Sequence, residues 1–462
     1  MTSANRTLPL APIPRTIEEL GLPETVIIDL ILRRILFDGR TLLSRMSQTL
    51  GLTGQLTESI VRYLREDKKY VDFESMVGRD WLVGLTELGK KLANDSVERI
   101  SYAGIAPVSL SDYRRVVAAQ TRRPVVTREA VRNAFHDLVV SDRLIDEVGP
   151  AMMGEGAIFL YGPPGTGKSS VAERLTRLLG DTILIPRAIE VDGAFILVYD
   201  PTVHHAIDPQ PEDVDARWVV CQRPSIVVGG ELTRSQLDLI YDKQSGLHLA
   251  SLQLKANNGI LVIDDFGRQQ MTPSELLNRW IVPLDRSIDY LTLAWGVRFD
   301  VPFDTRVVFS TNLDPATLGD EAFYRRLPNK VYVGSIDNDQ FDWILVVCAR
   351  KHGLELDADC ANHLRMLIRT MGDGDLRPYV PNVACQLSKA ICMYEGLELR
   401  ITRGILDRVA SLYFTKLVQH ETDPIDDESL HRELALYNAG APDCEMNADR
   451  VPQVSPDGMT PF

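Results

Sequence analysis

The sequence lacks the features that mark several specialised classes of protein. No stretch reaches the ~18 consecutive apolar residues that a bilayer-crossing helix needs, so we expect no insertion into a membrane. The N-terminal residues lack the apolar core of a secretory signal, and we therefore expect a cytoplasmic protein. The six cysteines never form a C-x-x-C pair, which argues against a zinc or disulfide framework.

Positive charge is also in deficit. The chain has 50 Lys and Arg against 64 Asp and Glu, a net charge of −14, whereas a general nucleic-acid coat needs the opposite sign. Residues 1–110 carry as many basic as acidic residues, so the whole deficit belongs to residues 111–462. The first hundred residues are therefore expected to form a separate unit.

The 462 residues exceed what a single hydrophobic core usually organises. The apolar patterns predict six parts. The first three are a flexible N-terminus (1–19), a small domain (20–105) and a linker (106–125). The other three are an α/β region (126–336), an all-helical region (337–420) and a mostly disordered acidic tail (421–462). The small domain has the order helix–helix–helix–hairpin–helix, which resembles a winged helix-turn-helix. In the α/β region, strand-like runs alternate with helical patterns, which predicts a parallel sheet with helices on both faces.

The most specific pattern joins a buried strand at residues 157–161 to a helix that includes residues 171–179. Between them lies a loop of the form G-x-x-x-x-G-K-[ST], made of Gly162, Pro163, Pro164, Gly165, Thr166, Gly167, Lys168, Ser169 and Ser170. Its glycines let backbone N–H groups surround phosphates, to which the new helix presents its positive end. Lys168 adds a cation, and the Ser169 hydroxyl is an oxygen ligand for Mg²⁺. The loop therefore predicts a site for a nucleotide triphosphate and its magnesium ion.

A second apolar strand, residues 259–263, ends in Asp264 and Asp265. Adjacent carboxylates at the end of a buried strand repel each other unless a cation offsets their charge. We predict that Asp264 holds the magnesium ion and that Asp265 polarises the attacking water. The structural alternative is that the two aspartates cap the turn that follows the strand.

Together these motifs resemble the AAA+ ATPase superfamily over roughly residues 126–420. The resemblance implies ATP as the nucleotide, Mg²⁺-dependent hydrolysis, and a homo-oligomer in a ring or partial ring with ATP between subunits. It also implies that the helical region 337–420 is a lid. The second acid of this motif is usually Glu in the superfamily, so Asp265 is a departure that leaves slow hydrolysis open.

The resemblance assigns four further residues. Asn312, after the strand 306–311, is similar to the sensor 1 residue, although it could instead start a turn. Arg325 and Arg326 lie where an arginine finger reaches the nucleotide of a neighbouring subunit, and we do not choose between them; a surface salt network is the alternative. Arg377 is the sensor 2 candidate, with a structural arginine as the alternative.

Residues 290–300 alternate around Gly296 and predict a β-hairpin before the sensor 1 strand. This hairpin is similar to that of MoxR-like and magnesium-chelatase-like members. The segment 181–258 is longer than a parallel crossover requires, and we expect extra strands there, including 193–200 and 217–230. We expect His204 and His205 to be exposed loop residues rather than metal ligands.

Three functions follow from these expectations. The first is an oligomeric ATPase that couples hydrolysis to remodelling of a protein partner. The second is a DNA-associated ATPase or regulator that uses residues 53–67 as a recognition helix. The cations Arg62, Arg65, Lys68 and Lys69 favour contact with DNA phosphates, whereas the acids Glu58, Glu66 and Asp67 oppose it. The third is a scaffold gated by nucleotide that hydrolyses ATP very slowly.

Overall fold

The computed structural model describes residues 11–121, 126–315 and 327–414. Packing divides the chain into two compact units, Met1–Leu356 with Leu376–Arg400 and Asp357–Asp375 with Ile401–Phe462. This division does not coincide with the boundaries that we predicted at residues 105, 125 and 336. The predicted tail, 421–462, lies outside the described residues, as do residues 1–10 of the predicted N-terminus.

The first part of the chain forms helices around a small antiparallel sheet. Its elements are η1 (Glu18–Leu20), α1 (Glu24–Asp38), β1 (Arg40–Leu42), α2 (Leu43–Leu50), α3 (Gly54–Glu66), β2 (Val71–Val77), β3 (Asp80–Leu85) and α4 (Glu87–Arg99). The strands lie in the order β1-β3-β2. Gly78, at a φ of 65°, turns the β2–β3 hairpin, since glycine adopts this left-handed conformation without strain. Thr53 and Thr86 accept backbone hydrogen bonds at the starts of α3 and α4, as N-caps do.

The stretch that we expected to be a linker, residues 106–125, contains regular structure. Strand β4 (Val108–Ser109) leads directly into helix α5 (Leu110–Gln120). Tyr113, Val116 and Val117 of α5 are buried in a core that they share with strands far away in the sequence. The stretch therefore anchors the first part of the chain to the α/β part.

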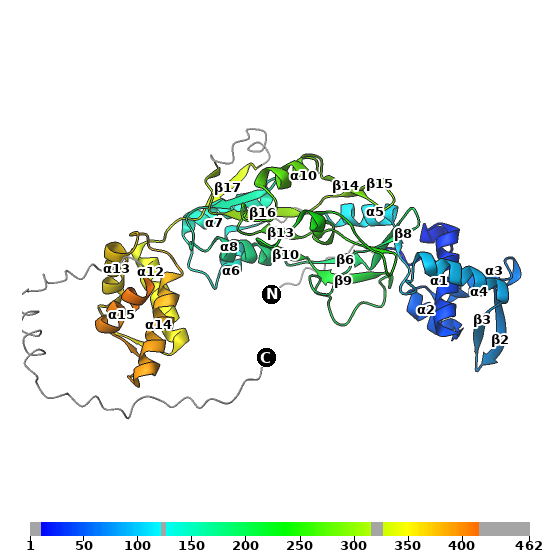
Figure 1. Ribbon diagram of the computed structural model, residues 1–462, viewed down its shortest axis with the longest axis horizontal. Coiled ribbons are helices and arrows are strands. Elements are labelled where there is room, and N and C mark those ends of the chain that lie inside the picture. The colour runs from blue at the N-terminus through cyan, green and yellow to red at the C-terminus, as the bar shows by residue number, and fades with distance from the viewer. Residues whose placement is uncertain (1–10, 122–125, 316–326, 415–462) are drawn as a thin grey trace, which may run out of the picture. The chain divides into compact units, whose positions relative to one another are not determined.

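A five-stranded, fully parallel sheet organises the α/β part, in the order β10-β13-β16-β5-β17. Its strands are β5 (Ile158–Tyr161), β10 (Ser225–Val228), β13 (Ile260–Ile263), β16 (Arg306–Thr311) and β17 (Asn329–Tyr332), and the helices around it are α6 (Arg128–Ala134), α7 (Asp142–Met153), α8 (Lys168–Leu175) and α10 (Pro273–Arg286). Figure 1 shows α10 on one side of this sheet and α6 and α8 on the other.

Alternating side chains of the sheet bury into two separate cores. Ile158 of β5 and Val262 of β13 face the core shared with α6, α7 and α8. Phe159 and Leu261 face the opposite core, which contains Trp280 of α10. Because successive residues of a strand point to opposite faces, these continuous apolar strands are buried on both sides, as the sequence predicted.

The α/β part contains three further sheets, of which the hairpin β14–β15 is described below. A mixed sheet has the order β11-β12-β8-β7-β4, and β6 pairs antiparallel with β9. The strands introduced here are β6 (Thr182–Pro186), β7 (Ala188–Val191), β8 (Ala194–Leu197), β9 (Trp218–Gln222), β11 (Ile240–Asp242) and β12 (Leu247–Leu249). The short helices between them are η2 (Thr176–Leu178), η3 (Arg234–Leu237) and α9 (Leu252–Lys255). The sequence predicts strands over residues 217–222 and 225–230, and both are present. They belong to different sheets: β9 pairs with β6, whereas β10 follows Pro224 and forms the edge of the parallel sheet, where it pairs with β13.

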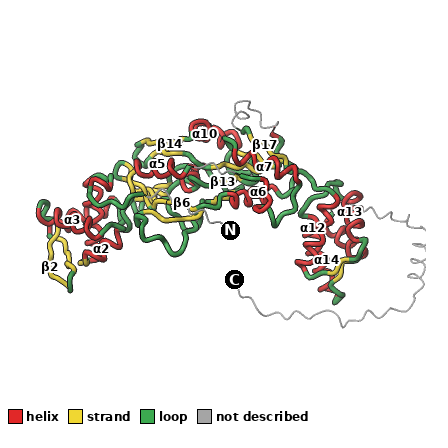
Figure 2. Tube along the Cα trace, turned by 180° about the vertical axis from the view of Figure 1, so that it is seen from behind, coloured by secondary structure: helices red, strands yellow, loops and turns green. Residues whose placement is uncertain are grey.

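The predicted hairpin before β16 is present. Strands β14 (Ile288–Thr292) and β15 (Arg298–Pro302) pair antiparallel, and Gly296 adopts a φ of 90° in the turn between them. The C-terminal region is helical, as predicted and as Figure 2 shows by its colour. It contains α12 (Asn338–His352), β18 (Glu355–Leu356), α13 (Cys360–Met371), α14 (Val380–Glu395), β19 (Arg400–Ile401) and α15 (Arg403–Tyr413).

The second compact unit pairs α13 with α15. His363 and Asp407 interact at 2.6 Å, and Arg403 forms an ion pair with Asp359 at 2.6 Å. Across the described parts of the chain, no helix combines the length and the apolar content that a membrane crossing would require.

Candidate functional site

The parallel sheet brings three of the predicted motifs to one edge. β5 ends at Tyr161, which is in register with Thr311 at the end of β16, and β13 lies on the other side of β16. Gly162, Asp264 and Asn312 follow these three strands directly. Carboxyl ends of parallel strands are the usual place for ligands in an open α/β sheet, so this edge is the natural position of a site.

Two glycines of the loop have no room for a side chain. A Cβ atom on Gly162 would lie 2.2 Å from the carbonyl oxygen of Val333, and one on Gly165 would lie 2.3 Å from the ring of Tyr379. Gly165 also adopts a φ of 78°, which is costly for any other residue. The glycines are therefore required by close backbone and ring contacts as well as by the turn.

Lys168 begins helix α8 and is only 6% exposed. Its ammonium donates hydrogen bonds to the carbonyl oxygens of Gly162 at 3.1 Å and Pro163 at 2.7 Å. Burial lowers the pKa of Lys168, while the charges of Asp264 and Asp265 act in the opposite direction. The lysine and both aspartates are therefore close enough to interact electrostatically, which places the two motifs at one site.

A cavity of about 790 Å³ lies over this edge. Seven of the predicted loop residues, Pro164 to Ser170, line it together with Asp264, Asp265 and Asn312. Gly162 and Pro163 do not line it but hold the lysine through their carbonyl groups. Thr166 closes the loop with a hydrogen bond from its hydroxyl to the carbonyl of Pro163 at 3.0 Å.

The two aspartates do not behave as caps of the following turn. Asp264 is partly buried and Asp265 is exposed, and neither carboxylate accepts a hydrogen bond from any residue that the structure describes. Asp265 also adopts a φ of 47°, a left-handed conformation that is uncommon for residues other than glycine. Two carboxylates without donors, beside a buried ammonium, have the charge to hold a cation.

Asn312 lines the cavity without closing the turn that follows β16. The hydroxyl of Thr311 accepts the Leu313 N–H at 3.0 Å and donates to the carbonyl of Phe266 at 2.7 Å. The alternative role for Asn312 was to start this turn. The side-chain hydrogen bonds of the turn come from Thr311 instead.

Arg377 lies in the turn before α14, where its carbonyl accepts the Val380 N–H at 3.1 Å. Its positive charge is one of the causes that lower the pKa of Lys168, after burial. The tertiary structure therefore brings this arginine near the loop from more than 200 residues away in the sequence. Arg325 and Arg326, the two finger candidates, lie outside the described residues.

Several residues of the cavity were missed by the sequence analysis. Tyr379 packs on Gly165, and the basic side chains of Arg268 and Lys351 also line the cavity. Apolar residues form another part of the wall, namely Leu138, Val139, Val140, Ile336, Ile344 and Val347. Only the pair Val139–Val140, a short apolar run just before a helix, carried a signal that could have suggested such a wall.

The donors present suit magnesium rather than a transition metal. Ser169 and Asp264 offer hard oxygen atoms in one cavity, and such sites hold Mg²⁺ through one or two carboxylates together with phosphate oxygens. Among the described residues, there is no group of three or more His, Cys, Asp or Glu side chains that could form a metal site by themselves. His204, which we expected to be exposed, is 1% exposed and has both ring nitrogens hydrogen-bonded. Its burial corrects that expectation.

Comparisons with known proteins give distant similarities. A family model described as a domain of unknown function, DUF8689, matches residues 337–412. A solved structure of RuvB, the Holliday junction branch migration motor of Thermotoga maritima, is 14% identical with a TM-score of 0.34, covering 63% of this chain and 72% of that chain. NtrX from Brucella abortus is 12% identical with a TM-score of 0.32, covering 77% and 68% respectively. At these values the similarity assigns neither protein's activity to this chain.

Proposed function

We propose that the protein binds ATP with Mg²⁺ at the edge of the parallel sheet and hydrolyses it. The observation that carries this proposal is the buried ammonium of Lys168 in one cavity with two carboxylates that lack hydrogen-bond donors. A triphosphate with its magnesium ion fits this arrangement, since the metal pairs with the acids and a phosphate oxygen can accept the third N–H of the ammonium, which the carbonyls of Gly162 and Pro163 do not use.

Each residue has a separate role in this proposal. Backbone N–H groups from Gly165 to Ser170 and the positive end of α8 bind the phosphates. Ser169 and Asp264 hold the metal ion, which neutralises charge on the transferring phosphoryl group when bound. Asp265 orients the attacking water and accepts its proton, and Asn312 positions that water. The apolar wall at Val139 and Ile344 receives the adenine ring.

We further propose that hydrolysis occurs between subunits of a homo-oligomer and drives remodelling of a protein partner. Arg325 or Arg326 would stabilise charge on the phosphoryl group of the neighbouring subunit. Arg377, near Lys168, would respond to loss of the phosphate and move the lid, residues 337–420. We also propose that residues 20–105 and 126–336 are separate domains of this machine.

The small winged-helix-like domain at residues 20–105 is proposed to bind protein rather than DNA. Three of the four cations that would favour DNA, namely Arg62, Arg65 and Lys68 but not Lys69, interact with neighbouring side chains. Arg62 pairs with Glu58 at 2.8 Å and Lys68 with Glu24 at 3.2 Å. Arg65 stacks over Phe73 at 4.7 Å. At the hairpin tip, Met76 and Val77 are exposed, and exposed apolar side chains favour a protein partner.

The decisive experiment is calorimetric titration of the folded protein with ATP and Mg²⁺, followed by a phosphate-release assay. We expect saturable binding that requires the metal, and turnover of bound ATP. Binding without measurable turnover would support the slow nucleotide-gated scaffold instead. Absence of binding to any purine triphosphate would overturn the whole proposal. Salt-dependent binding of duplex DNA by the full chain, lost in Arg62→Ala, would favour the DNA-associated alternative.

The interfacial finger is tested by mixing subunits. Arg325→Ala or Arg326→Ala subunits retain their own loop, whereas Lys168→Ala subunits retain their own arginines. If the site is shared between subunits, each inactive variant complements or poisons the other, and the activity of the mixture departs from the average of its components. A mixture whose activity equals that average contradicts an interfacial site.

A further inference from the structure

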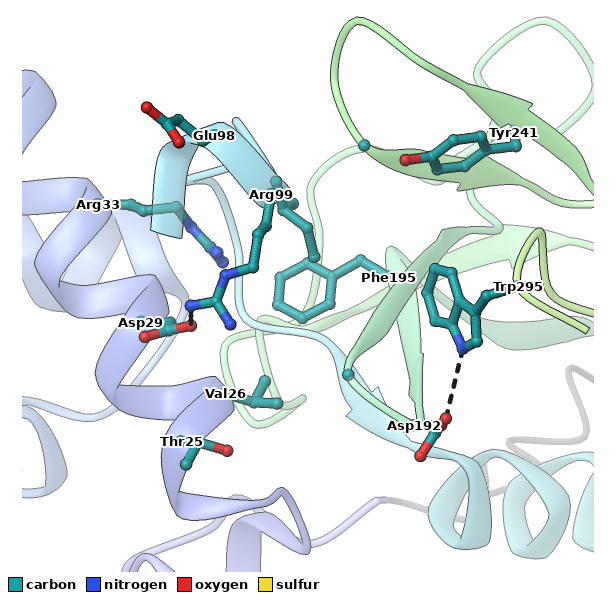
Figure 3. Close-up of a pocket in the computed structure, with 13 residues that line it drawn as sticks. Thr25, Val26, Asp29, Arg33, Glu98, Arg99, Asp192, Phe195, Tyr241 and Trp295 are labelled. Atoms are coloured by element: carbon teal, nitrogen blue, oxygen red, sulfur yellow. Dashed lines mark hydrogen bonds and ion pairs between the residues drawn. The ribbon is translucent and has the colours of Figure 1, made fainter. Parts of the chain in front are cut away.

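A second cavity, of about 510 Å³, lies between helices α1 and α4 and the mixed sheet. Its size falls within the range of ligand pockets, roughly 300–1,000 Å³. Figure 3 shows Phe195 of β8 in its middle, with Arg33 and Arg99 on one side and Trp295, from the turn of the β14–β15 hairpin, on the other. This cavity contains none of the residues of the proposed nucleotide site.

The wall of this cavity contains a buried arginine with two unused donors. Arg33 is 2% exposed, and its Nη1 donates to the Ser96 hydroxyl at 3.0 Å. Its Nε and Nη2 have no hydrogen-bond partner among the described residues. These two N–H groups lie along the same edge of the guanidinium, which is the edge that binds a carboxylate with two parallel hydrogen bonds.

Burial lowers the pKa of Arg33 to about 10, so the side chain remains charged at neutral pH. The guanidinium lies 5.5 Å from the centre of the Phe195 ring, and Figure 3 shows it extending from α1 toward that ring. Buried donors without partners are costly. A ligand oxyanion on the Nε–Nη2 edge would remove this cost.

Aromatic rings supply the apolar part of the cavity. Besides Phe195, the lining includes Tyr241 and Trp295, which are 38% and 51% exposed. His248 packs against both rings, at centroid distances of 4.9 Å and 5.4 Å. Partly exposed aromatic rings held in place by a neighbour suit an apolar or planar ligand group.

The charge of the lining restricts the ligand further. Asp29, Glu98 and Asp192 line the cavity together with Arg33 and Arg99, giving three negative and two positive charges. Arg99 is paired with Asp29 at 2.9 Å, and the charge of Asp29 also acts on Arg33. A dianionic phosphate is disfavoured by this balance, whereas a ligand with one carboxylate and one ammonium matches it.

We propose that this cavity binds a zwitterionic amino acid or dipeptide that carries a large apolar side chain. The carboxylate binds the Nε–Nη2 edge of Arg33, the ammonium binds Asp192, and the side chain packs between Phe195 and Trp295. The proposal is independent of the nucleotide site, because the two cavities share no residue.

Calorimetric titration of the full chain tests the ligand class. The probes are L-phenylalanine and L-leucyl-L-phenylalanine, with 2-phenylethylamine, which lacks the carboxylate, N-acetyl-L-phenylalanine, which lacks the ammonium, and inorganic phosphate as controls. We expect one of the two zwitterions to bind roughly 10- to 100-fold more tightly than 2-phenylethylamine, as charge-assisted hydrogen bonds to Arg33 imply. Binding of phosphate alone, or of no probe at millimolar concentration, overturns the proposal.

Three variants test the residues. Arg33→Met should abolish the preference for a carboxylate, but it alters a core position. Asp192→Asn is the second test, since Asp192 is exposed at a φ of 49°, a conformation that Asn tolerates. It should abolish the preference for L-phenylalanine over N-acetyl-L-phenylalanine.

Trp295→Ala should weaken binding about fivefold, and Trp343→Ala, which removes another exposed tryptophan on α12, is the matched control that should not. Thermal unfolding verifies that each variant is folded. Unchanged selectivity in folded Asp192→Asn, together with unchanged affinity in Trp295→Ala, contradicts the proposed binding mode.

Discussion

Two clusters of polar side chains in the α/β part differ in how their hydrogen-bonding capacity is used. At the end of the parallel sheet, the carboxylates of Asp264 and Asp265 have no donors among the described residues and line a cavity. Beneath α5, by contrast, polar side chains satisfy one another. Gln120 donates to the carbonyl of Leu184 at 3.2 Å and to Asn258 at 3.1 Å, and Arg223 pairs with Asp181 at 2.6 Å.

If the proposed function is right, this difference separates a cluster that binds nucleotide from one that is structural. Both clusters contain acids, amides and a basic residue, so residue type alone does not distinguish them. A satisfied buried network contributes to the stability of one conformation, whereas polar groups without partners in a cavity retain their capacity for a ligand. Substitutions in the first cluster should therefore alter nucleotide chemistry, and the same substitutions in the second should alter stability.

The largest effect is expected for two lysines of the α/β part, buried Lys168 and partly buried Lys255. Lys168→Ala removes the ammonium from the phosphate loop and should weaken ATP binding by roughly 100-fold or more, with little loss of stability. Lys255→Ala is the matched control, because Lys255 pairs with Asp200 at 2.8 Å away from the loop. It should lower the free energy of unfolding by about 1 kcal/mol and leave ATP affinity unchanged. Calorimetry and denaturant unfolding measure both quantities, and equal ATP affinities in the two variants would break the comparison.

The next effect concerns two aspartates. Asp265→Asn removes the proposed base and should reduce ATP turnover roughly 100-fold, while ATP binding changes by no more than about threefold. Asp181→Asn removes the partner of buried Arg223 and should cost about 2 kcal/mol of stability without altering turnover by folded protein. Normal turnover in Asp265→Asn would show that another group accepts the proton.

A smaller effect is expected for two glycines. Gly165→Ala places a Cβ atom against Tyr379 in a left-handed conformation and should weaken ATP binding about tenfold, given a conformational cost of ~1–2 kcal/mol. Gly180→Ala is the control, since nothing lies within 4 Å of its Cβ position. If both variants bind ATP like the wild type, the loop does not require the observed contacts.

The smallest effect concerns pH and His204. Its Nδ1 accepts the Asp200 N–H at 2.9 Å, and its Nε2 contacts the Lys255 carbonyl at 2.8 Å. Burial lowers the pKa of His204 below its ordinary value of 6.5. The unfolded chain therefore takes up a proton before the folded one, so stability is full above pH 6.5 and is lost as the pH falls toward the lowered pKa, by at most about 1.4 kcal/mol per pH unit.

Denaturant unfolding at pH 7 and pH 5.5 measures this loss. His204→Gln should lose less stability on acidification than the wild type. His205→Gln, at the exposed neighbouring position, should respond to acid as the wild type does. The same acid response in all three proteins would show that His204 does not titrate differently on folding.

Much of the fold was predictable because its signals are local. The five strands of the parallel sheet are short apolar runs, and Gly296 marked the hairpin. Helix α5 was missed although Tyr113, Val116 and Val117 are spaced as one helical face, because two prolines near its ends suggested a linker. The sequence did not state which strand β10 pairs with, because strand pairing depends on contacts that are distant in the sequence.

The amino-acid sequence by itself determined the glycine-rich loop between β5 and α8, because its glycines adopt backbone conformations that nine consecutive residues specify. It also determined the two-sided burial of the central strands, because continuous apolar runs must be covered on both faces. Only the tertiary structure decided which polar side chains are satisfied and which remain available. It placed Tyr379 on Gly165, brought Arg377 near Lys168, and left Arg33 beside Phe195 with unused donors. The physical reason is that a hydrogen bond or a ring contact depends on distance in space, which the order of residues does not state.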